Sequence, residues 1–113
     1  MSFTDRQILD HILEAVEVAS ILVEEGHERF LIETKSQYAS DTVLTRIGES
    51  AKELSEQMIS RMPEIPWKLV KGMRDRIAHA SINNDYQIIW SSMVNDIPAI
   101  GAAVRKVIED SGQ

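Results

Sequence analysis

Cysteine is absent from the 113-residue chain, which excludes disulfide bonds and thiolate metal sites. The chain also lacks any apolar run near the ~20 residues that a membrane-spanning helix needs. Its first five residues, MSFTD, have neither the basic region nor the apolar region of a secretory signal. We therefore expect one domain, residues 1–113, located in the cytoplasm and without a membrane partner.

Aromatic residues make up only 5% of the chain, which argues against the stacking platforms with which many proteins bind single strands. The five glycines are scattered, so no glycine-rich phosphate loop is present. The three histidines are isolated from one another and form no H-x-x-x-H pair. We expect no metal site and no cofactor.

The net charge of −6 is unevenly distributed, and as an average it does not suggest a general nucleic-acid binder. Residues 1–60 carry 5 Lys/Arg and 12 Asp/Glu, a balance of −7, whereas residues 61–113 carry 7 and 6, a balance of +1. Within residues 61–79, five side chains are basic and two are acidic. If the chain binds RNA, we expect the phosphates to lie along this segment.

The first helix is predicted from its capping residues. Thr4 as N-cap places Gln7 at the third helical position, which forms a capping box, and Phe3 can pack on Ile8. Apolar residues then recur at helical spacing until Gly26, a residue type that often ends helices. A short additional helical turn is expected over residues 27–33.

A second helix is predicted over residues 36–61, because its apolar residues alternate at three- and four-residue spacing, as in helices packed lengthwise on one another. The segment from Pro63 to Pro66 should break it, since proline lacks the amide proton. A third helix is expected over residues 67–80.

Asn83 or Asn84 should cap a last helix, in which Pro98 causes a kink or an interruption. No segment alternates apolar and polar residues with period two for long enough to suggest a sheet. The predicted fold is therefore all-α: an antiparallel bundle of four to five helices.

The segment from Met73 to His79 contains the side chains that could perform chemistry. Lys71, Asp75 and His79 are four residues apart and line one stripe of a helix, with Arg74 beside it. Arg74 and His79 are separated by ~140° around a regular helix. A twofold dimer that brings two such helices together could direct both groups at one phosphate.

These side chains suffice for RNA cleavage by attack of a ribose 2′-hydroxyl on its adjacent phosphate. Histidine can act as acid or base near neutral pH, so two copies of His79 can divide these roles. The guanidinium of Arg74 suits the phosphoryl oxygens, and Asp75 could orient His79 and favour its protonated form. Lys71 and Arg76 are candidates for holding the substrate, although both can equally be solubilising charges.

The alternative is that these residues have no chemical role. An arginine and a histidine on an exposed helix are most often solvated polar side chains, and the R-x-x-x-x-H spacing alone occurs often by chance. His11 and His27 are best interpreted as surface or partly buried residues, and Trp90 as part of the core. A structural helical bundle with incidental polar residues is consistent with spacing alone.

Several motifs together make the chain resemble the HepT-like family of HEPN proteins. They occur in the family's order, over residues 46–55, 63–67 and 72–79 and then at Asp85 and Trp90. The resemblance extends over roughly residues 5–108. It implies a short helical bundle that forms a homodimer, with the catalytic arginine and histidine facing a cleft across the twofold axis.

The resemblance also implies a metal-independent endoribonuclease, commonly a toxin paired with a small nucleotidyltransferase antitoxin. Arg74 and His79 match the family's catalytic pair, Asp75 matches the polar position after the arginine, and Glu49 lies on a helix that packs beside the site. Ser81 stands where the family usually has a tyrosine to which the antitoxin attaches AMP.

Two questions stay open at this point. The change to Ser81 leaves undecided whether a nucleotide is attached there, whether inhibition is by binding alone, or whether regulation or activity is lost; Tyr86 need not replace the tyrosine. The alternative function is a non-catalytic dimeric helical module that binds or regulates a nucleotidyltransferase. The presence of Arg74 and His79 together with Asp75 favours the nuclease over this alternative, because a pure binding module has no chemical need for these three residues.

Overall fold

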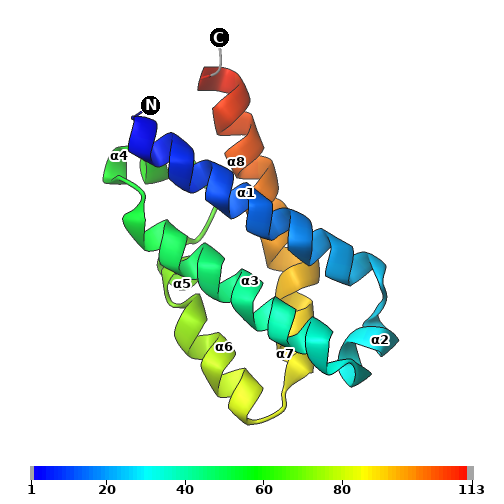
Figure 1. Cartoon of the computed structure of the whole chain (residues 1–113). Helices are drawn as coiled ribbons and strands as arrows, with labels where there is room; N and C mark the ends of the chain where they lie inside the picture. Colours follow the sequence, from blue (N-terminus) through cyan, green and yellow to red (C-terminus); the bar gives the residue numbers. More distant parts are fainter. Residues whose placement is uncertain (1, 112–113) are drawn as a thin grey trace.

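Helices account for the regular structure of residues 2–111, the part of the chain that the computed structural model describes (Figure 1). They are α1 (Phe3–Glu24), α2 (His27–Ile32), α3 (Thr34–Glu53), α4 (Glu56–Ser60), α5 (Trp67–Lys71), α6 (Met73–Ile82), α7 (Tyr86–Ser91), the π-helical segment η1 (Ser92–Asp96) and α8 (Ile97–Ser111). This part contains no strand, which confirms the predicted all-α class. α3 lies between α1 and α6, and α8 packs across α1 (Figure 1).

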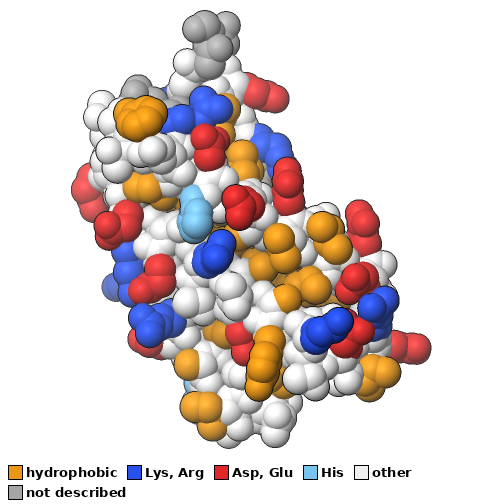
Figure 2. Space-filling view, viewed as in Figure 1, with side chains coloured by type: hydrophobic (Ala, Val, Ile, Leu, Met, Phe, Trp, Pro, Cys, Tyr) orange, Lys and Arg blue, Asp and Glu red, His pale blue; other side chains and the backbone are white. Residues whose placement is uncertain are grey.

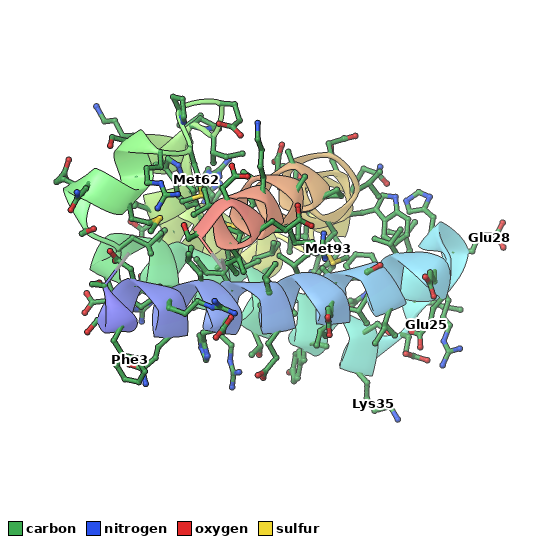
Figure 3. The ribbon with its side chains drawn as sticks, turned by 90° about the horizontal axis from the view of Figure 1, so that it is seen from above. Phe3, Glu25, Glu28, Lys35, Met62 and Met93 are labelled. Atoms are coloured by element: carbon green, nitrogen blue, oxygen red, sulfur yellow. The ribbon has the colours of Figure 1, made fainter. Side chains whose placement is uncertain are left out.

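The core lies between these helices and contains the apolar seam predicted for the second helix. All five seam residues are buried: Leu44, Ile47, Ala51, Leu54 and Met58. Met62 and Met93 are also buried, and a view from above shows them between the helices (Figure 3). Ile88 is exposed, while Ile8 and Val23 are only partly buried against the core.

The start of α1 differs from the prediction. Ser2, not Thr4, is the N-cap, and its side chain accepts a hydrogen bond from the amide of Asp5. Phe3 does not pack on the helix; its side chain is 77% exposed and points away from the body of the molecule (Figure 3). The helix begins two residues earlier than predicted because the hydroxyl of Ser2 accepts a hydrogen bond from an amide of the first turn, and helix ends need such acceptors.

The predicted second helix is divided at residues 54–55 into α3 and α4. Ser55 has extended backbone angles and caps α4, accepting a hydrogen bond from the amide of Met58 at 3.1 Å. The amide and hydroxyl of Ser55 in turn donate to the buried carboxylate of Asp5, at 3.0 and 2.7 Å. These bonds stabilise a break that apolar spacing alone does not indicate.

The predicted third helix is also divided, at Gly72, into α5 and α6. Gly72 has φ −89° and ψ 5°, and its amide bonds to Leu69 three residues earlier, as in the tighter last turn of a helix. Glycine lowers the stability of a helix interior, which favours an interruption at this residue. The interruption places Arg74 in the first turn of α6.

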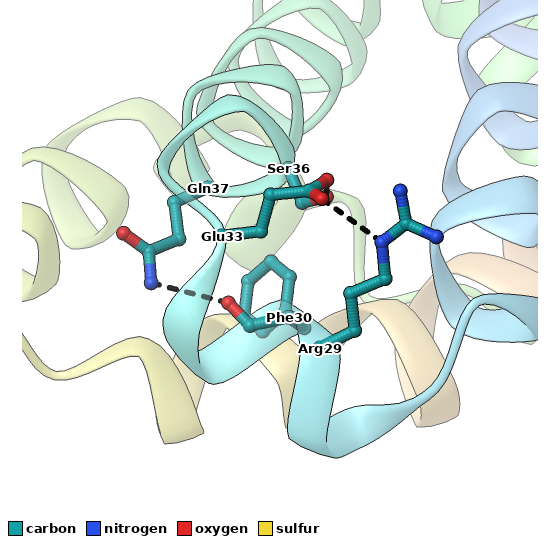
Figure 4. A network of polar contacts seen from close by, with 5 residues as sticks. All are labelled: Arg29, Phe30, Glu33, Ser36 and Gln37. Carbon is teal, nitrogen blue, oxygen red and sulfur yellow. Dashed lines mark hydrogen bonds and ion pairs between the residues drawn. The ribbon is translucent and has the colours of Figure 1, made fainter.

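The junction of α2 and α3 is held by polar contacts (Figure 4). Arg29 pairs with Glu33 at 2.9 Å, and the hydroxyl of Ser36 also donates to Glu33. The side-chain amide of Gln37 donates to the carbonyl of Phe30 at 3.1 Å. The predicted end of the first helix is confirmed, since Gly26 follows α1 with φ +103°, a conformation that favours glycine.

The last predicted helix becomes α7, η1 and α8. Its N-cap is Asp85, not Asn83 or Asn84, because Asn84 turns the chain with φ +56° one residue earlier. The interruption predicted from Pro98 is confirmed as the π-helical segment that directly precedes α8, since proline cannot donate the regular helical hydrogen bond. Over residues 2–111, none of the helices is both long and apolar enough to pass through a membrane.

Candidate active site

α6 presents two different surfaces beside its core face. Met73, Ile77 and Ala80 are buried against the rest of the bundle. The side that we call the outward face consists of Asp75, Ala78, His79 and Ile82, all of which are exposed. The side that we call the α3-facing flank consists of Arg74 and Ser81, which are seven residues apart and so point in nearly the same direction.

Arg74 is held on the α3-facing flank by an ion pair. Its Nη1 lies 3.3 Å from Oε1 of Glu49 on α3, and the Arg74 side chain is 62% exposed. Oε2 of Glu49 lies 2.7 Å from the ammonium of Lys52. This contact with Lys52 is the main cause that lowers the pKa of Glu49, so the carboxylate stays ionised.

His79 occupies the last turn of α6 on the outward face. Its carbonyl accepts from the amide of Asn83 at 3.2 Å and from the Asn83 side chain at 2.8 Å, which secures the backbone there. Its imidazole makes no hydrogen bond or ion pair with any other described residue, Asp75 included. The ring is therefore accessible, and the orienting role of Asp75 stays a prediction.

Arg74 and His79 of one chain are not brought together. α6 is a regular α-helix from Met73 to Ile82, so the offset of about 140° expected from the sequence is retained. Arg74 points toward α3, whereas His79 points outward from the bundle. A site that uses both groups on one phosphate needs His79 and Arg74 from facing copies of α6, or a moved Arg74 side chain.

Of the two predicted substrate-binding residues, Arg76 lies on another flank of α6 than Arg74, and Lys71 belongs to the preceding helix. Arg76 donates to the carbonyl of Leu69 at 3.3 Å and lines a small cavity with Asn95 and Asp96, on the opposite flank of α6. Lys71 is half-buried at the end of α5. The basic segment is thus divided between two sides of α6.

Ser81, the predicted regulatory position, is part of a half-buried polar cluster with Asp41 and Tyr86. The hydroxyl of Ser81 donates to Oδ2 of Asp41 at 3.0 Å and lies 3.3 Å from the hydroxyl of Tyr86. Oδ1 of Asp41 is buried without a hydrogen bond from any described residue. Burial raises the pKa of Asp41, and the bond from Ser81 only partly opposes this.

The contact with Asp41 was missed by the sequence reasoning. Asp41 and Glu49 are both on α3. Glu49, the later of the two in the sequence, contacts Arg74 at the start of α6, and Asp41 contacts Ser81 near its end. This antiparallel pairing is a signal that could have identified Asp41, once α3 and α6 were assumed to be neighbours.

Other polar groups show no comparable arrangement. His27 bonds to Gln87 at 2.7 Å and lies against Trp90, with ring centroids 5.0 Å apart, and it makes these contacts with α7 and not with α6. Residues 2–111 contain no group of three or more histidine, aspartate or glutamate side chains placed to hold a metal ion. On the face in Figure 2, basic and acidic side chains are interleaved around hydrophobic ones over α1 and α3. The described residues of this face therefore present no broad basic surface to phosphates.

Comparison with known proteins adds independent information. Residues 12–107 match a family described as Ribonuclease HepT-like. The chain is 32% identical to a probable ribonuclease HepT of Thermococcus cleftensis, over 95% of this chain and 98% of that protein. It is 30% identical to a putative RNase of Caldanaerobacter subterraneus subsp. tengcongensis, over 94% and 96%. A putative RNase of Methanocaldococcus jannaschii is 34% identical, over 74% of this chain and 69% of its own length. No solved structure matches the chain significantly.

Proposed function

The chain belongs to the HepT-like ribonuclease family of the HEPN superfamily, and from this premise we propose that it is a metal-independent endoribonuclease. The observation that carries the proposal is the placement of Arg74 and His79 on α6. Both side chains are exposed, and the imidazole of His79 makes no hydrogen bond or ion pair with any other described residue. His79 is therefore available to transfer protons, and Arg74 to bind a phosphate.

The proposed reaction is attack of a ribose 2′-hydroxyl on the adjacent phosphate. One His79 takes the proton of the 2′-hydroxyl, and the oxygen forms a bond to phosphorus. The bond to the 5′-oxygen breaks, and a second His79 donates a proton to that leaving oxygen. Arg74 stabilises the negative charge on the phosphoryl oxygens. The products are a 2′,3′-cyclic phosphate and a free 5′-hydroxyl. The step consumes no water and needs no metal ion.

The proposed site requires a symmetric homodimer in which the outward faces of two α6 helices meet. Ile82 supports this arrangement, because it is 81% exposed on that face, next to His79. Ala78, between Arg74 and His79, is small enough to let two helices approach closely. Burying Ile82 against a second copy would also remove an apolar side chain from water.

The remaining predicted residues have supporting roles in this proposal. Asp75 orients the imidazole of His79. The two residues are one helical turn apart, so rotation about the side-chain bonds of Asp75 can bring its carboxylate to the ring. Lys71 holds the neighbouring phosphates of the RNA; Arg76, on the other flank, contributes at longer range by its charge.

The biological role that we propose is a cytoplasmic toxin inhibited by a small nucleotidyltransferase antitoxin. Ser81 marks the regulatory position, although its hydroxyl donates to Asp41 and lies beside Tyr86. A nucleotide attached to either hydroxyl would lie on the α3-facing flank, on the same side of α6 as Arg74. An adjacent reading frame for a nucleotidyltransferase would support this role, and mass spectrometry after incubation with that partner and ATP would identify the modified residue.

The test of the nuclease proposal is cleavage of a short RNA by the purified dimer in the presence of EDTA. We expect full activity with EDTA, products that end in 2′,3′-cyclic phosphate, and no cleavage where the site carries 2′-deoxyribose. Loss of activity with EDTA that magnesium restores would contradict the mechanism. If no RNA is cleaved at all, the chain is better described as the non-catalytic dimeric module that binds a nucleotidyltransferase.

A further inference from the structure

The position of Glu49 beside Arg74 is determined by a close approach of two helices at Gly48. A Cβ atom added at Gly48 would lie 3.0 Å from the carbonyl oxygen of Val70 and 3.3 Å from Cβ of Met73. Only glycine therefore allows α3 to lie this close to the junction of α5 and α6 without adjustment. Because Glu49 is the next residue, its side chain meets Arg74 in the first turn of α6.

The two oxygens of Glu49 contact two different cations. Oε1 pairs with Nη1 of Arg74 at 3.3 Å, and Oε2 pairs with Nζ of Lys52 at 2.7 Å. The side chain of Glu49 is 39% exposed, less than that of Arg74 at 62%. The carboxylate of Glu49 is therefore the more restrained partner of this ion pair, and it limits the movement of the longer and more exposed arginine.

We infer that Glu49 is a positioning residue, which holds the guanidinium of Arg74 in place to receive a phosphate. Within residues 2–111, the contacts of the Arg74 side chain involve only Nη1, so Nε and Nη2 keep the fork that binds phosphate oxygens. Lys52 offsets the negative charge of Glu49, which would otherwise repel the RNA. The inference rests on the proposed nuclease function.

The same contacts contribute little to folding. All three side chains are substantially exposed, and ion pairs of this kind have a small effect on the free energy of unfolding. Variants of Glu49 should therefore fold, so that their kinetics report on the site. An arginine released from its partner samples many side-chain conformations, and imprecise placement lowers the rate of the chemical step.

The test compares Glu49→Ala and Glu49→Gln with Glu53→Ala, which removes the same charge one turn further along α3. We expect Glu49→Ala to lower kcat roughly tenfold and to change KM less than about twofold, because placement and not binding is lost. Glu49→Gln should recover most of this loss, since its amide oxygen can still accept from Nη1. Glu53→Ala should match the parent. In an Arg74→Ala background, Glu49→Ala should cause no further loss, because Glu49 acts through Arg74.

Two results would overturn the inference. An equal rise of kcat/KM in Glu49→Ala and Glu49→Gln would mean that Glu49 only competes with the phosphate. An undiminished loss from Glu49→Ala in the Arg74→Ala background would mean that Glu49 acts elsewhere.

If the parent cleaves no RNA, the proposed function fails, and the contact is tested by NMR: rotation of the Arg74 guanidinium should be slow in the parent and fast in Glu49→Ala. Fast rotation in both would refute the positioning role.

Discussion

The α3-facing flank and the outward face of α6 differ in how their side chains are used within the chain. On the flank, Arg74 pairs with Glu49, and Ser81 donates to Asp41. On the outward face, the imidazole of His79 makes no such contact with another described residue, and Ile82 is 81% exposed. The flank is thus organised by the fold itself, whereas on the outward face His79 and Ile82 are exposed, and the proposal is that a second copy of the chain covers them.

The largest effect is expected on the outward face, from His79→Ala. Removal of proton transfer should lower the cleavage rate by roughly 10²–10⁴-fold, while the melting temperature stays close to that of the parent because the side chain is exposed. Cleavage of a fluorogenic RNA and thermal melting measure the two quantities. His11→Ala, on the exposed side of α1, is the matched control. If His79→Ala cleaved RNA as fast as the parent, the nuclease proposal would have to be abandoned in favour of the binding module.

On the flank, Arg74→Ala should lower the cleavage rate on the order of a hundredfold, because it removes stabilisation of the phosphoryl charge. Arg74→Lys should restore only part of the rate, since an ammonium keeps the charge but lacks the planar fork. Arg46→Ala, which removes an exposed arginine from α3, is the control for net charge. Equal rates for Arg74→Ala and Arg46→Ala would reduce Arg74 to a general basic residue.

The claim that the outward face needs a second molecule is tested by Ile82→Glu. A carboxylate in place of this side chain should prevent two α6 helices from meeting, since burying an unpaired charge is costly. Light scattering at micromolar concentration should show a dimer for the parent and a monomer for Ile82→Glu, with a parallel loss of cleavage. Ile21→Glu, also at an exposed apolar position but on α1, should stay dimeric. A monomeric parent would remove the basis of the shared site.

The smallest effect is expected at the other contact of the flank, from Asp41→Asn. Because burial raises the pKa of Asp41, ionisation of this carboxyl lowers the free energy of unfolding. This loss of stability develops as the pH rises through the pKa of Asp41 in the folded state. Asp41→Asn should therefore melt at a slightly higher temperature than the parent at pH 7. The difference should vanish near pH 3, below the ordinary aspartate pKa of about 3.9. Glu17→Gln, an exposed change of the same charge, should show no such pattern; a difference independent of pH would contradict the assignment.

The sequence predicted which segments are helical better than where the helices end. Apolar spacing depends on the local chain, so the buried seam through Leu44, Ile47 and Ala51 could be predicted. The break at Ser55 depends on Asp5, fifty residues earlier, and no local pattern reports such a contact. The interruption at Gly72 combines a small helix-breaking preference with tertiary packing, and such preferences are weak evidence on their own.

For the candidate site too, features that depend on the local sequence could be predicted, and contacts between distant segments could not. Arg74 and His79 were predicted as site residues because several motifs of the family coincide, and that role stays a prediction; helix geometry correctly predicted that the two side chains diverge. The contact between Ser81 and Asp41 has no local signal, because a single aspartate on α3 is not distinctive by itself; predicting it requires knowing that α3 and α6 pack antiparallel. It depends on the register in which α3 and α6 pack.

The bond between Asp5 and Ser55 has a consequence for the order in which parts of the molecule open. Ser55 lies between two helices, where an amide would ordinarily exchange its hydrogen with solvent quickly, but its amide is donated to the buried carboxylate of Asp5 at 3.0 Å. The first turn of α1 therefore cannot fray without releasing this amide. In native-state hydrogen exchange, we expect the Ser55 amide to exchange together with the amino-terminal turn of α1, as one cooperative unit that joins segments fifty residues apart.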